Sequence, residues 1–406
     1  MSAIPTEFRR AFGVLGDREK LLRVLAASPW KHGCMSAEAS REPTGPRVGV
    51  VGAGIVGLCT AYQLLQRGVD ATVYEQGVPG NGQSGGVSRI FRHAHDDPRL
   101  IESAQESRAL YAEWGRDLGL ELVSPDGAVA IGPAVKTRLP LLQQLGVSAR
   151  EIDAAELAAY VPILAGYKGT AMLDEEGGSI RTSATIQALS AALGDRLIPD
   201  EVISLGEHGD RVELRSGGST EIFDRVVVAA GRGTAHLART VGLSLPIRQA
   251  AHVRLTFEVA GDAPDRLATW QDSSGEFGET GIYAAAAPGN AAYGLGLSHT
   301  TEVREDGSLA SPQELSDLAD RAHRYVRRAM PGLRPDPVDV RHCWVTELPW
   351  SSDGLAVWQC GGLLFPVGHN LFKQAPALGR KLADAVCGAE LDPSLLPQSR
   401  LGAPAG

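Results

Sequence analysis

The chain has 406 residues, of which 43% are hydrophobic and 21% charged, and its formal net charge is −9. These values are typical of a globular protein long enough for two domains, and the negative charge argues against nucleic acid as a partner. No apolar run reaches the about 18 residues of a membrane-spanning helix, and five scattered cysteines indicate reduced thiols in a cytoplasmic protein rather than disulfides or a zinc site.

Residues 1–46 are predicted to be an N-terminal extension and a linker. An amphipathic pattern at Glu19–Ala26 predicts a short helix. The run Ser36–Pro46 is polar and contains proline and glycine, which is typical of a linker. Met35 stands directly before it and is a candidate for the natural start, with residues 1–34 as an upstream extension.

The strongest local pattern follows the linker. A strand is predicted at Val48–Val51, a helix at Ile55–Arg67 and a second strand at Ala71–Glu75. The loop before the helix contains glycines that permit a tight turn, the approach of a pyrophosphate and close helix–strand packing. Free N–H groups at the start of the helix favour phosphate binding there. The predicted contacts of this loop are Gly52, Gly54, Ile55, Val56 and Gly57.

Glu75 ends the second predicted strand, where a carboxylate commonly binds the ribose hydroxyls of a dinucleotide. Its charge would repel the 2′-phosphate of NADP. The strand, the loop, the helix and the acid together predict a dinucleotide site, but they do not distinguish FAD from NAD.

The rest of the chain predicts a second, β-rich part inserted into the first. A long helix is predicted near Arg99–Leu118. Later strands are predicted at Ala128–Ile131, Val212–Leu214, Arg225–Ala229, Val253–Val259, Gly281–Ala287, Ala292–Ser298 and Leu363–Val367, followed by a helix from Ala377. The predicted fold class is therefore α/β, with a Rossmann-like nucleotide domain and an inserted β-rich (α+β) domain.

Two further segments carry chemistry. The Gly-rich run Gly80–His93 contains two arginines, Arg89 and Arg92, and the turn Gly368–Lys373 ends in a lysine. Each segment alone is also compatible with a solvent-exposed loop, in which the lysine would extend to water. Together, Arg92 and Lys373 could bind an anion.

The sequence resembles the sarcosine oxidase and glycine oxidase branch of the D-amino acid oxidase-like flavoproteins. The resemblance covers nearly everything from Arg47 to Val386 and is carried by motifs in the family's order. These are the loop Gly52–Gly57 with Glu75, the run Ser88–His93, the segment Val226–Gly231, Cys343 and the turn Gly368–Lys373. The resemblance implies FAD as the cofactor.

It also implies roles for single residues. Arg92 and Lys373 match the pair that binds the substrate carboxylate, and Arg89 matches an arginine close to the flavin ring. Val202 matches a position whose backbone meets the adenine. Further implied cofactor contacts are Ser88, Ala230, Gly231, Gly368, Asn370, Leu371 and Lys373. The predicted domains are 47–123, 180–243 and 350–395 for FAD binding, and 124–179 and 244–349 for the substrate.

Cys343 matches the cysteine that bonds covalently to the flavin in sarcosine oxidases. The residues around it are only partly similar, because Cys-Trp-Val-Thr-Glu-Leu-Pro lacks the family's aromatic residue two positions after the cysteine. The alternative is that Cys343 is a buried, small hydrophobic residue.

Four positions depart from the family. Gly296 stands where the family has an oxygen-activating lysine, and Gly85 stands where it has a histidine. A cation near the flavin promotes reaction with oxygen. The predictions are therefore that His299 or Arg89 takes the place of the missing lysine, or that the electron acceptor is not oxygen. Ala284 and Val345 stand in place of aromatic residues over the substrate, which predicts a substrate larger than sarcosine, unless Trp344 or Trp350 fills the space.

The predicted function is the FAD-dependent oxidation of the C–N bond of an amino acid or N-substituted glycine to an imine, with oxygen reduced to hydrogen peroxide. The nearest alternative is a flavin dehydrogenase of the same fold that uses another acceptor. An NAD-dependent dehydrogenase and a flavin-holding protein without turnover are further alternatives, against which Arg89, Arg92 and Lys373 argue. The sequence makes no prediction of the oligomeric state.

Overall fold

The computed structural model describes residues 45–403 of the chain. The predicted helix at Glu19–Ala26, the candidate start at Met35 and most of the linker lie outside the described residues. Among the helices of the described part, none combines the length and the apolarity needed to cross a bilayer.

A six-stranded sheet contains the predicted dinucleotide unit. Its strand order is β19-β20-β12-β1-β2-β8, and all neighbours are parallel except β19 and β20. The central strand β1 is buried along its whole length, as expected for a parallel strand with both faces covered. The strands are β1 (Val48–Val51), β2 (Ala71–Tyr74), β8 (Leu197–Ile198), β12 (Arg225–Val228), β19 (Leu355–Cys360) and β20 (Leu363–Gly368).

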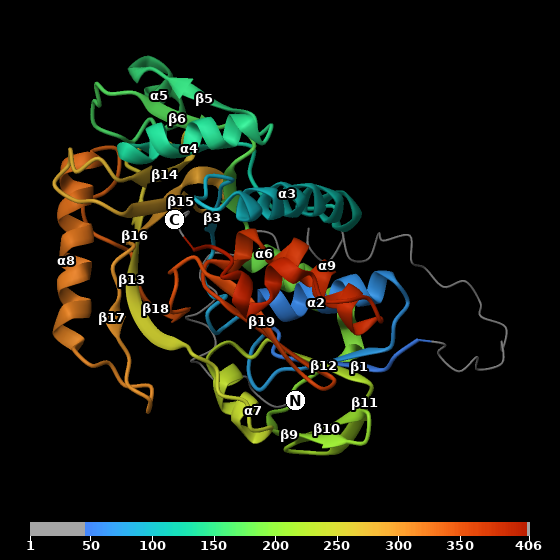
Figure 1. The fold of residues 1–406 in the computed structure, drawn as a ribbon. Coiled ribbons are helices and arrows are strands. Elements are labelled where there is room, and N and C mark those ends of the chain that lie inside the picture. The colour runs from blue at the N-terminus through green and yellow to red at the C-terminus, as the bar shows by residue number, and fades with distance from the viewer. Residues whose placement is uncertain (1–44, 404–406) are drawn as a thin grey trace, which may run out of the picture. The chain divides into compact units, whose positions relative to one another are not determined.

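Four helices accompany this sheet: α2 (Ile55–Gln66), α3 (Pro98–Leu118), α6 (Thr182–Leu193) and α9 (Ala375–Val386). Helix α2 packs against α6 and α9, and α9 in turn contacts α3. Ten of the twelve residues of α2 are buried, so this helix lies in the core (Figure 1). Helix α3 begins where Asp97 accepts a hydrogen bond from the Arg99 amide and proline follows as the first helical residue.

A nine-stranded mixed sheet forms the second layer. Its order is β17-β13-β16-β15-β14-β4-β6-β5, with β18 also paired to β13. The amphipathic helix α8 (Pro312–Ala329) packs on β13 and β16 (Figure 1). The strands are β4 (Ala128–Ile131), β5 (Ala149–Ile152), β6 (Ala171–Asp174), β13 (Arg248–Glu258), β14 (Thr269–Asp272), β15 (Ile282–Ala286), β16 (Ala292–Leu297), β17 (Thr301–Glu302) and β18 (Asp339–Glu347).

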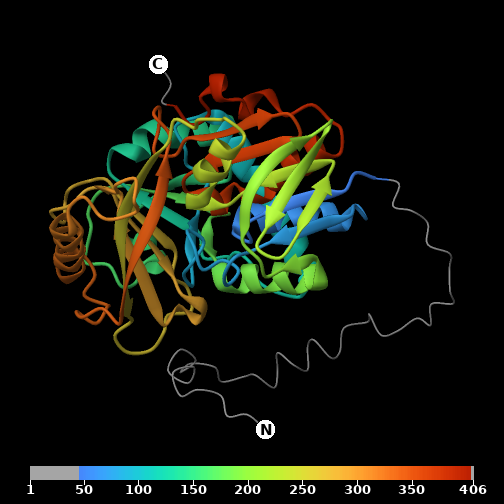
Figure 2. The same cartoon turned by 90° about the horizontal axis from the view of Figure 1, so that it is seen from below.

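Helices α4 (Pro133–Gln144) and α5 (Ala154–Tyr160) lie in the β4–β6 region of this sheet. A separate three-stranded sheet contains β9 (Val202–His208), β10 (Arg211–Ser216) and β11 (Thr220–Phe223), and α7 (Thr234–Thr240) packs on β9. Figure 2 shows this small sheet on the side away from α8.

The short strand β3 (Arg89–Phe91) connects the two layers. It pairs with β7 (Gly178–Ile180) and contacts β14 and β15 of the large sheet as well as the turn Leu371–Lys373 after β20. The sequence run with the two arginines therefore lies between the layers.

The predicted fold class is confirmed, because a Rossmann-like parallel sheet and a β-rich mixed sheet are both present. The predicted strand at Val253–Val259 starts earlier, at Arg248, because residues 248–252 pair with β18. The exact domain boundaries stay a prediction.

Candidate active site

The loop between β1 and α2 has a backbone suited to phosphate binding. Gly52 has a φ of +98°, and a Cβ there would lie 2.5 Å from the carbonyl oxygen of Ala229. A Cβ on Gly54 would meet, within 4 Å, only the Ser84 hydroxyl among the described residues. The first glycine permits the turn, and the second leaves its side of the loop open to a ligand.

Glu75 follows β2 and is held by two backbone amides. Its Oε2 accepts a hydrogen bond from the Ala53 amide at 2.8 Å, and its Oε1 accepts one from the Gly77 amide at 2.9 Å. The carboxylate is thus fixed beside the glycine loop, where Val202 and Gly231 also line the same cavity.

One cavity of about 1950 Å³ extends from the glycine loop to Arg92 and Lys373. It is larger than the about 300–1,000 Å³ of a usual small-molecule site, so it has room for a dinucleotide and a second ligand. The predicted site residues that line it are Gly52, Gly54, Ile55, Val56, Glu75, Arg89, Arg92, Val202, Ala230, Gly231, Cys343, Gly368, Asn370, Leu371 and Lys373.

Two predicted contacts, Gly57 and Ser88, do not line the cavity. Gly57 lies against the Gly52 carbonyl, so it serves the packing of the turn. The Ser88 carbonyl oxygen accepts hydrogen bonds from Arg89 Nη1 at 3.1 Å and from Arg254 Nη1 at 2.6 Å. Ser88 therefore holds two arginines that do line the cavity.

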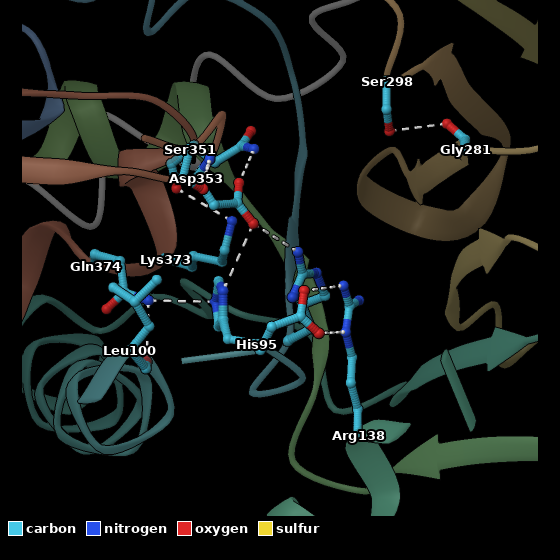
Figure 3. Close-up of polar contacts among 12 residues, drawn as sticks. His95, Leu100, Arg138, Gly281, Ser298, Ser351, Asp353, Lys373 and Gln374 are labelled. Atoms are coloured by element: carbon cyan, nitrogen blue, oxygen red, sulfur yellow. Dashed lines mark hydrogen bonds and ion pairs between the residues drawn. The ribbon is translucent and has the colours of Figure 1, made fainter. Parts of the chain in front are cut away.

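At one end of the cavity, Arg92, Asp353 and Lys373 all line the wall, and Figure 3 shows Lys373 beside Asp353. Arg92 Nη2 donates to Asp353 Oδ2 at 3.2 Å, and Asn370 Nδ2 donates to Asp353 Oδ1 at 2.6 Å. Lys373 Nζ donates to the Asn370 carbonyl oxygen at 3.3 Å. Arg92 is 7% exposed and Lys373 6%, and Arg92 Nη1 is a buried donor without a partner among the described residues.

His95 completes this group. Gln374 Nε2 donates to the Leu100 carbonyl oxygen at 3.2 Å, which fixes the orientation of the amide, and the same nitrogen lies 3.3 Å from His95 Nε2. Because an amide nitrogen only donates, the proton of the neutral imidazole lies on Nδ1, which is 3.6 Å from Asp353 Oδ2. We call Arg92, His95, Asp353, Asn370 and Lys373 the clamp.

Burial dominates the protonation of the clamp. Burial lowers the pKa of Lys373 to about 7, with Arg92 adding to the effect and Asp353 opposing it. Burial and Arg92 lower the pKa of His95 to about 3, so this histidine is neutral near pH 7. Burial alone would raise the pKa of Asp353, but Lys373, His95 and Arg92 hold it well below its usual range.

A second group of basic residues lines the cavity near Cys343: Arg89, Arg254 and Arg341. Arg254 is 7% exposed, and no carboxylate in the described part of the chain forms an ion pair with it. It donates to the Ser88 carbonyl and hydroxyl oxygens and to the Gly294 carbonyl oxygen. Burial and Arg89 lower its pKa to about 10, so it stays charged at neutral pH.

The two glycines predicted to stand in place of the family's lysine and histidine, Gly296 and Gly85, are next to this group. A Cβ on Gly296 would lie 2.5 Å from the Tyr283 hydroxyl, and a Cβ on Gly85 would lie 2.7 Å from Arg341 Nη1. Tyr283 and Arg341 therefore occupy the space beside these glycines. The Tyr283 hydroxyl is 2.6 Å from His252 Nδ1, and burial raises the pKa of Tyr283.

The structure corrects two details of the sequence interpretation. His299 is exposed and does not line the cavity, so the nearby buried cation is Arg254 instead. Ala284 points into the core of the large sheet, because its neighbour Tyr283 faces the cavity and side chains alternate along a strand. Ala284 thus carries no information on substrate size.

The two tryptophans named as possible obstructions form no side-chain hydrogen bond with a clamp residue in the described part of the chain. Trp344 lines the cavity under the guanidinium of Arg232, which is 4.8 Å from its ring. Trp350 Nε1 donates to the Leu401 carbonyl oxygen and its ring packs against Trp358. Val345 lines the cavity, although it is nearly fully buried.

Sequence reasoning missed Asp353, His95 and Arg254. His95 stands three positions after Arg92, and that short spacing was the available signal. Asp353 and Arg254 are distant in sequence from the residues they contact, and only the pairing of β13 with β16 and the turn before β19 bring them to the site.

The comparisons place the chain in a family of flavoenzymes. The family described as FAD dependent oxidoreductase (DAO) matches residues 47–385, so the chain belongs to it and the predicted resemblance is confirmed. FAD is therefore the cofactor that the family implies. The glycine loop, the fixed Glu75 and the size of the cavity fit this cofactor.

Particular relatives agree with this placement. A glycine oxidase from Pseudomonas aeruginosa is 27% identical over 390 residues, which cover 87% of this chain and 99% of that protein. The solved structure of NikD, an unusual amino acid oxidase essential for nikkomycin biosynthesis, matches with a TM-score of 0.74 and 21% identity, over 88% of this chain and 97% of that one. L-proline dehydrogenase from P. horikoshii matches with a TM-score of 0.70 and 15% identity, over 87% and 96% of the two chains.

Proposed function

We propose that this flavoenzyme oxidises the C–N bond of an amino acid or an N-substituted glycine-type amine to an imine. The observation that carries the proposal is the pair of buried cations Arg92 and Lys373, which line the same cavity as the glycine loop. A ligand carboxylate beside these two cations would accept charge-assisted hydrogen bonds, each worth about 1.5–3 kcal/mol. A relative named glycine oxidase supports this substrate class.

In this proposal Arg92 and Lys373 bind the substrate carboxylate with charge-assisted hydrogen bonds and orient the adjacent carbon. Glu75 would hold the ribose of FAD, and the open side of Gly54 would admit its pyrophosphate. A flavin held there would supply hydride acceptance from that carbon and electron transfer to the acceptor. No side chain is needed as a strong base, because the substrate amine loses its proton on binding, and the imine hydrolyses in water.

Anaerobic reduction of the bound flavin by a panel of N-alkyl glycines, cyclic imino acids and D-amino acids tests the proposal. We expect the flavin absorbance to bleach with at least one class. In Arg92→Leu the substrate concentration for half-maximal reduction should rise at least about thirtyfold, because truncating a buried charge partner costs about 2 kcal/mol or more. The control is Arg150→Leu, on a partly exposed arginine that pairs with Glu156 and Glu175. A panel that leaves the flavin oxidised contradicts the proposal.

We also propose that the FAD is covalently bound through Cys343. In support, Cys343 is a free cysteine that lines the cavity and is not fully buried. Acid precipitation of the holoenzyme should give a yellow pellet, and Cys343→Ser should give a colourless one. A colourless wild-type pellet contradicts covalent attachment and leaves Cys343 as a packing residue.

Oxygen is the proposed electron acceptor. The observation in favour is the charged, buried Arg254, since a fixed cation stabilises the negative charge that develops on oxygen during reduction. The alternative is a dehydrogenase with another acceptor, since similar folds carry both oxidase and dehydrogenase names. Stoichiometric hydrogen peroxide in air with substrate supports oxygen. Turnover only with an added quinone or dye supports the alternative.

A substrate larger than sarcosine remains part of the proposal. Its support is the size of the cavity and the presence of Val345 in its wall. Within the panel, N-alkyl glycines of increasing length and cyclic imino acids should reduce the flavin faster than sarcosine does. A cytoplasmic location is proposed on the scattered cysteines of the sequence.

A further inference from the structure

Asp353 gives the clamp a negative charge of its own. Its Oδ2 accepts from Arg92 Nη2 at 3.2 Å, its Oδ1 accepts from Asn370 Nδ2 at 2.6 Å, and its amide donates to Ser351 Oγ at 3.1 Å. The carboxylate is therefore fixed from both sides, and its side chain keeps 27% exposure on the cavity.

The contact with Asp353 also anchors the guanidinium of Arg92. Nη2 donates to Asp353, whereas Nη1 is buried and has no partner among the described residues. Arg92 therefore lines the cavity with its guanidinium held in place by Asp353.

The charges around the clamp add up to one positive charge. Arg92 and protonated Lys373 contribute two positive charges, and Asp353 contributes one negative charge. His95 and His369 are neutral near pH 7, because burial lowers their pKa values to about 3 and about 4. Arg138 is neutralised by Asp96, with N–O distances of 2.7 and 2.9 Å.

We propose that Asp353 is a positioning residue that restricts this site to substrates with a single carboxylate. It anchors Arg92, raises the pKa of Lys373 toward its usual value and offsets one of the two positive charges of the clamp, so that the first carboxylate of a ligand neutralises the clamp. The substrates are then amino acids or N-substituted glycines with a neutral or cationic remainder, and dicarboxylic amino acids are rejected. This inference rests on the proposed function, because it takes the clamp to be the carboxylate site.

The charge of Asp353 also sets the pH range of binding. Lys373 binds a carboxylate when protonated, so affinity falls as the pH rises through about 7, its lowered pKa. Asp353 is the nearby anion that opposes this lowering, so removing its charge should lower the pKa of Lys373 further and shift the fall in affinity to lower pH. The groups around Lys373 are Asp353, Arg92, His95, Arg138 and His369.

The test compares propanoate and succinate, which differ by one carboxylate, as ligands of the holoenzyme. Dissociation constants come from flavin absorbance at about 0.15 M ionic strength from pH 6 to 9. The wild-type protein should bind propanoate at least about tenfold more tightly than succinate, and Asp353→Asn should reduce this ratio below about threefold. In the same variant the fall in propanoate affinity should move to lower pH.

Two further variants separate charge from structure. Asp353→Glu keeps the negative charge, so its affinity for propanoate should decrease over the same pH range as that of the wild-type protein. Asp392→Asn removes a partly exposed carboxylate paired with Lys381 and should change neither measurement. Wild-type protein that binds both ligands equally, or an unchanged ratio and pH profile in Asp353→Asn, overturns the inference. Propanoate binding without bleaching by any amine overturns the proposed function alone, and no propanoate binding by the wild-type protein overturns both.

Discussion

Arg254 carries a positive charge in the cavity wall. Because its side chain is buried, bulk water screens this charge only weakly. Its hydrogen bonds go to neutral oxygens of Ser88 and Gly294, and its charged neighbours include Arg89 and Arg341. A guanidinium with such partners acts on any negative charge in the cavity more strongly than a surface arginine does. At an effective dielectric of about 20, one charge several ångströms away is worth about 2–4 kcal/mol.

We therefore predict that Arg254→Met weakens the binding of sulfite to the bound flavin at least about tenfold. Sulfite titration of the oxidised holoenzyme, followed by absorbance, measures this without turnover. Arg254→Lys keeps the charge and should retain most of the affinity. If Arg254→Met binds sulfite as tightly as the wild-type protein, Arg254 does not act on the flavin.

Strand β16 makes room for the side chains of its two neighbours. Gly296 pairs with Arg254 of β13 on one side and with Tyr283 of β15 on the other. A Cβ on Gly294 would lie 2.8 Å from Arg254 Nε. Glycine weakens a strand interior, so two glycines in one six-residue strand mark a close approach of other groups.

Gly294→Ala should therefore destabilise the protein by about 1–3 kcal/mol, the usual cost of overpacking a core, and should displace Arg254. Urea unfolding measures the first effect and sulfite affinity the second. Gly206→Ala is the matched control, because Gly206 lies inside strand β9 and a Cβ there would have no atom of the described residues within 4 Å. Equal stability of the two variants contradicts the close packing of Arg254 on Gly294.

The length and burial of a helix or strand decided whether the sequence could predict it. The periodic patterns located β1 and β4 at their observed bounds and α2 within one residue, because their local pattern agrees with their burial. The short strands β3, β7 and β8 were not predicted, because two or three residues carry no period and depend on distant partners. Asp353 and Arg254 were missed for a related reason, since strand register and a turn bring them to the cavity.

In the whole described molecule, the cavity draws its walls from both layers. Glu75 and Gly54 come from the six-stranded side, and Tyr283 and Arg254 come from the nine-stranded side. A ligand that occupies the cavity therefore contacts both layers at once. Arg92 and Lys373 are buried between the layers. A ligand in the cavity therefore also changes the surroundings of these two buried charges.

FAD should accordingly stabilise both layers together. In Cys343→Ser, which allows removal of a flavin held by that residue, adding FAD at a hundredfold excess over its Kd should add about 2.7 kcal/mol of stability. This corresponds to a rise in Tm of about 3 °C, because an entropy of unfolding of about 2.1 cal/mol/K per residue gives about 0.85 kcal/mol/K for a chain of this length. Trp114 of α3 beside the six-stranded layer and Trp270 of β14 in the nine-stranded layer are both fully buried. The near-ultraviolet circular dichroism signals lost in Trp114→Phe and in Trp270→Phe should therefore follow the two layers separately. A rise confined to one signal would mean that the cofactor binds one layer alone, whereas coincident shifts are expected if the cavity couples them.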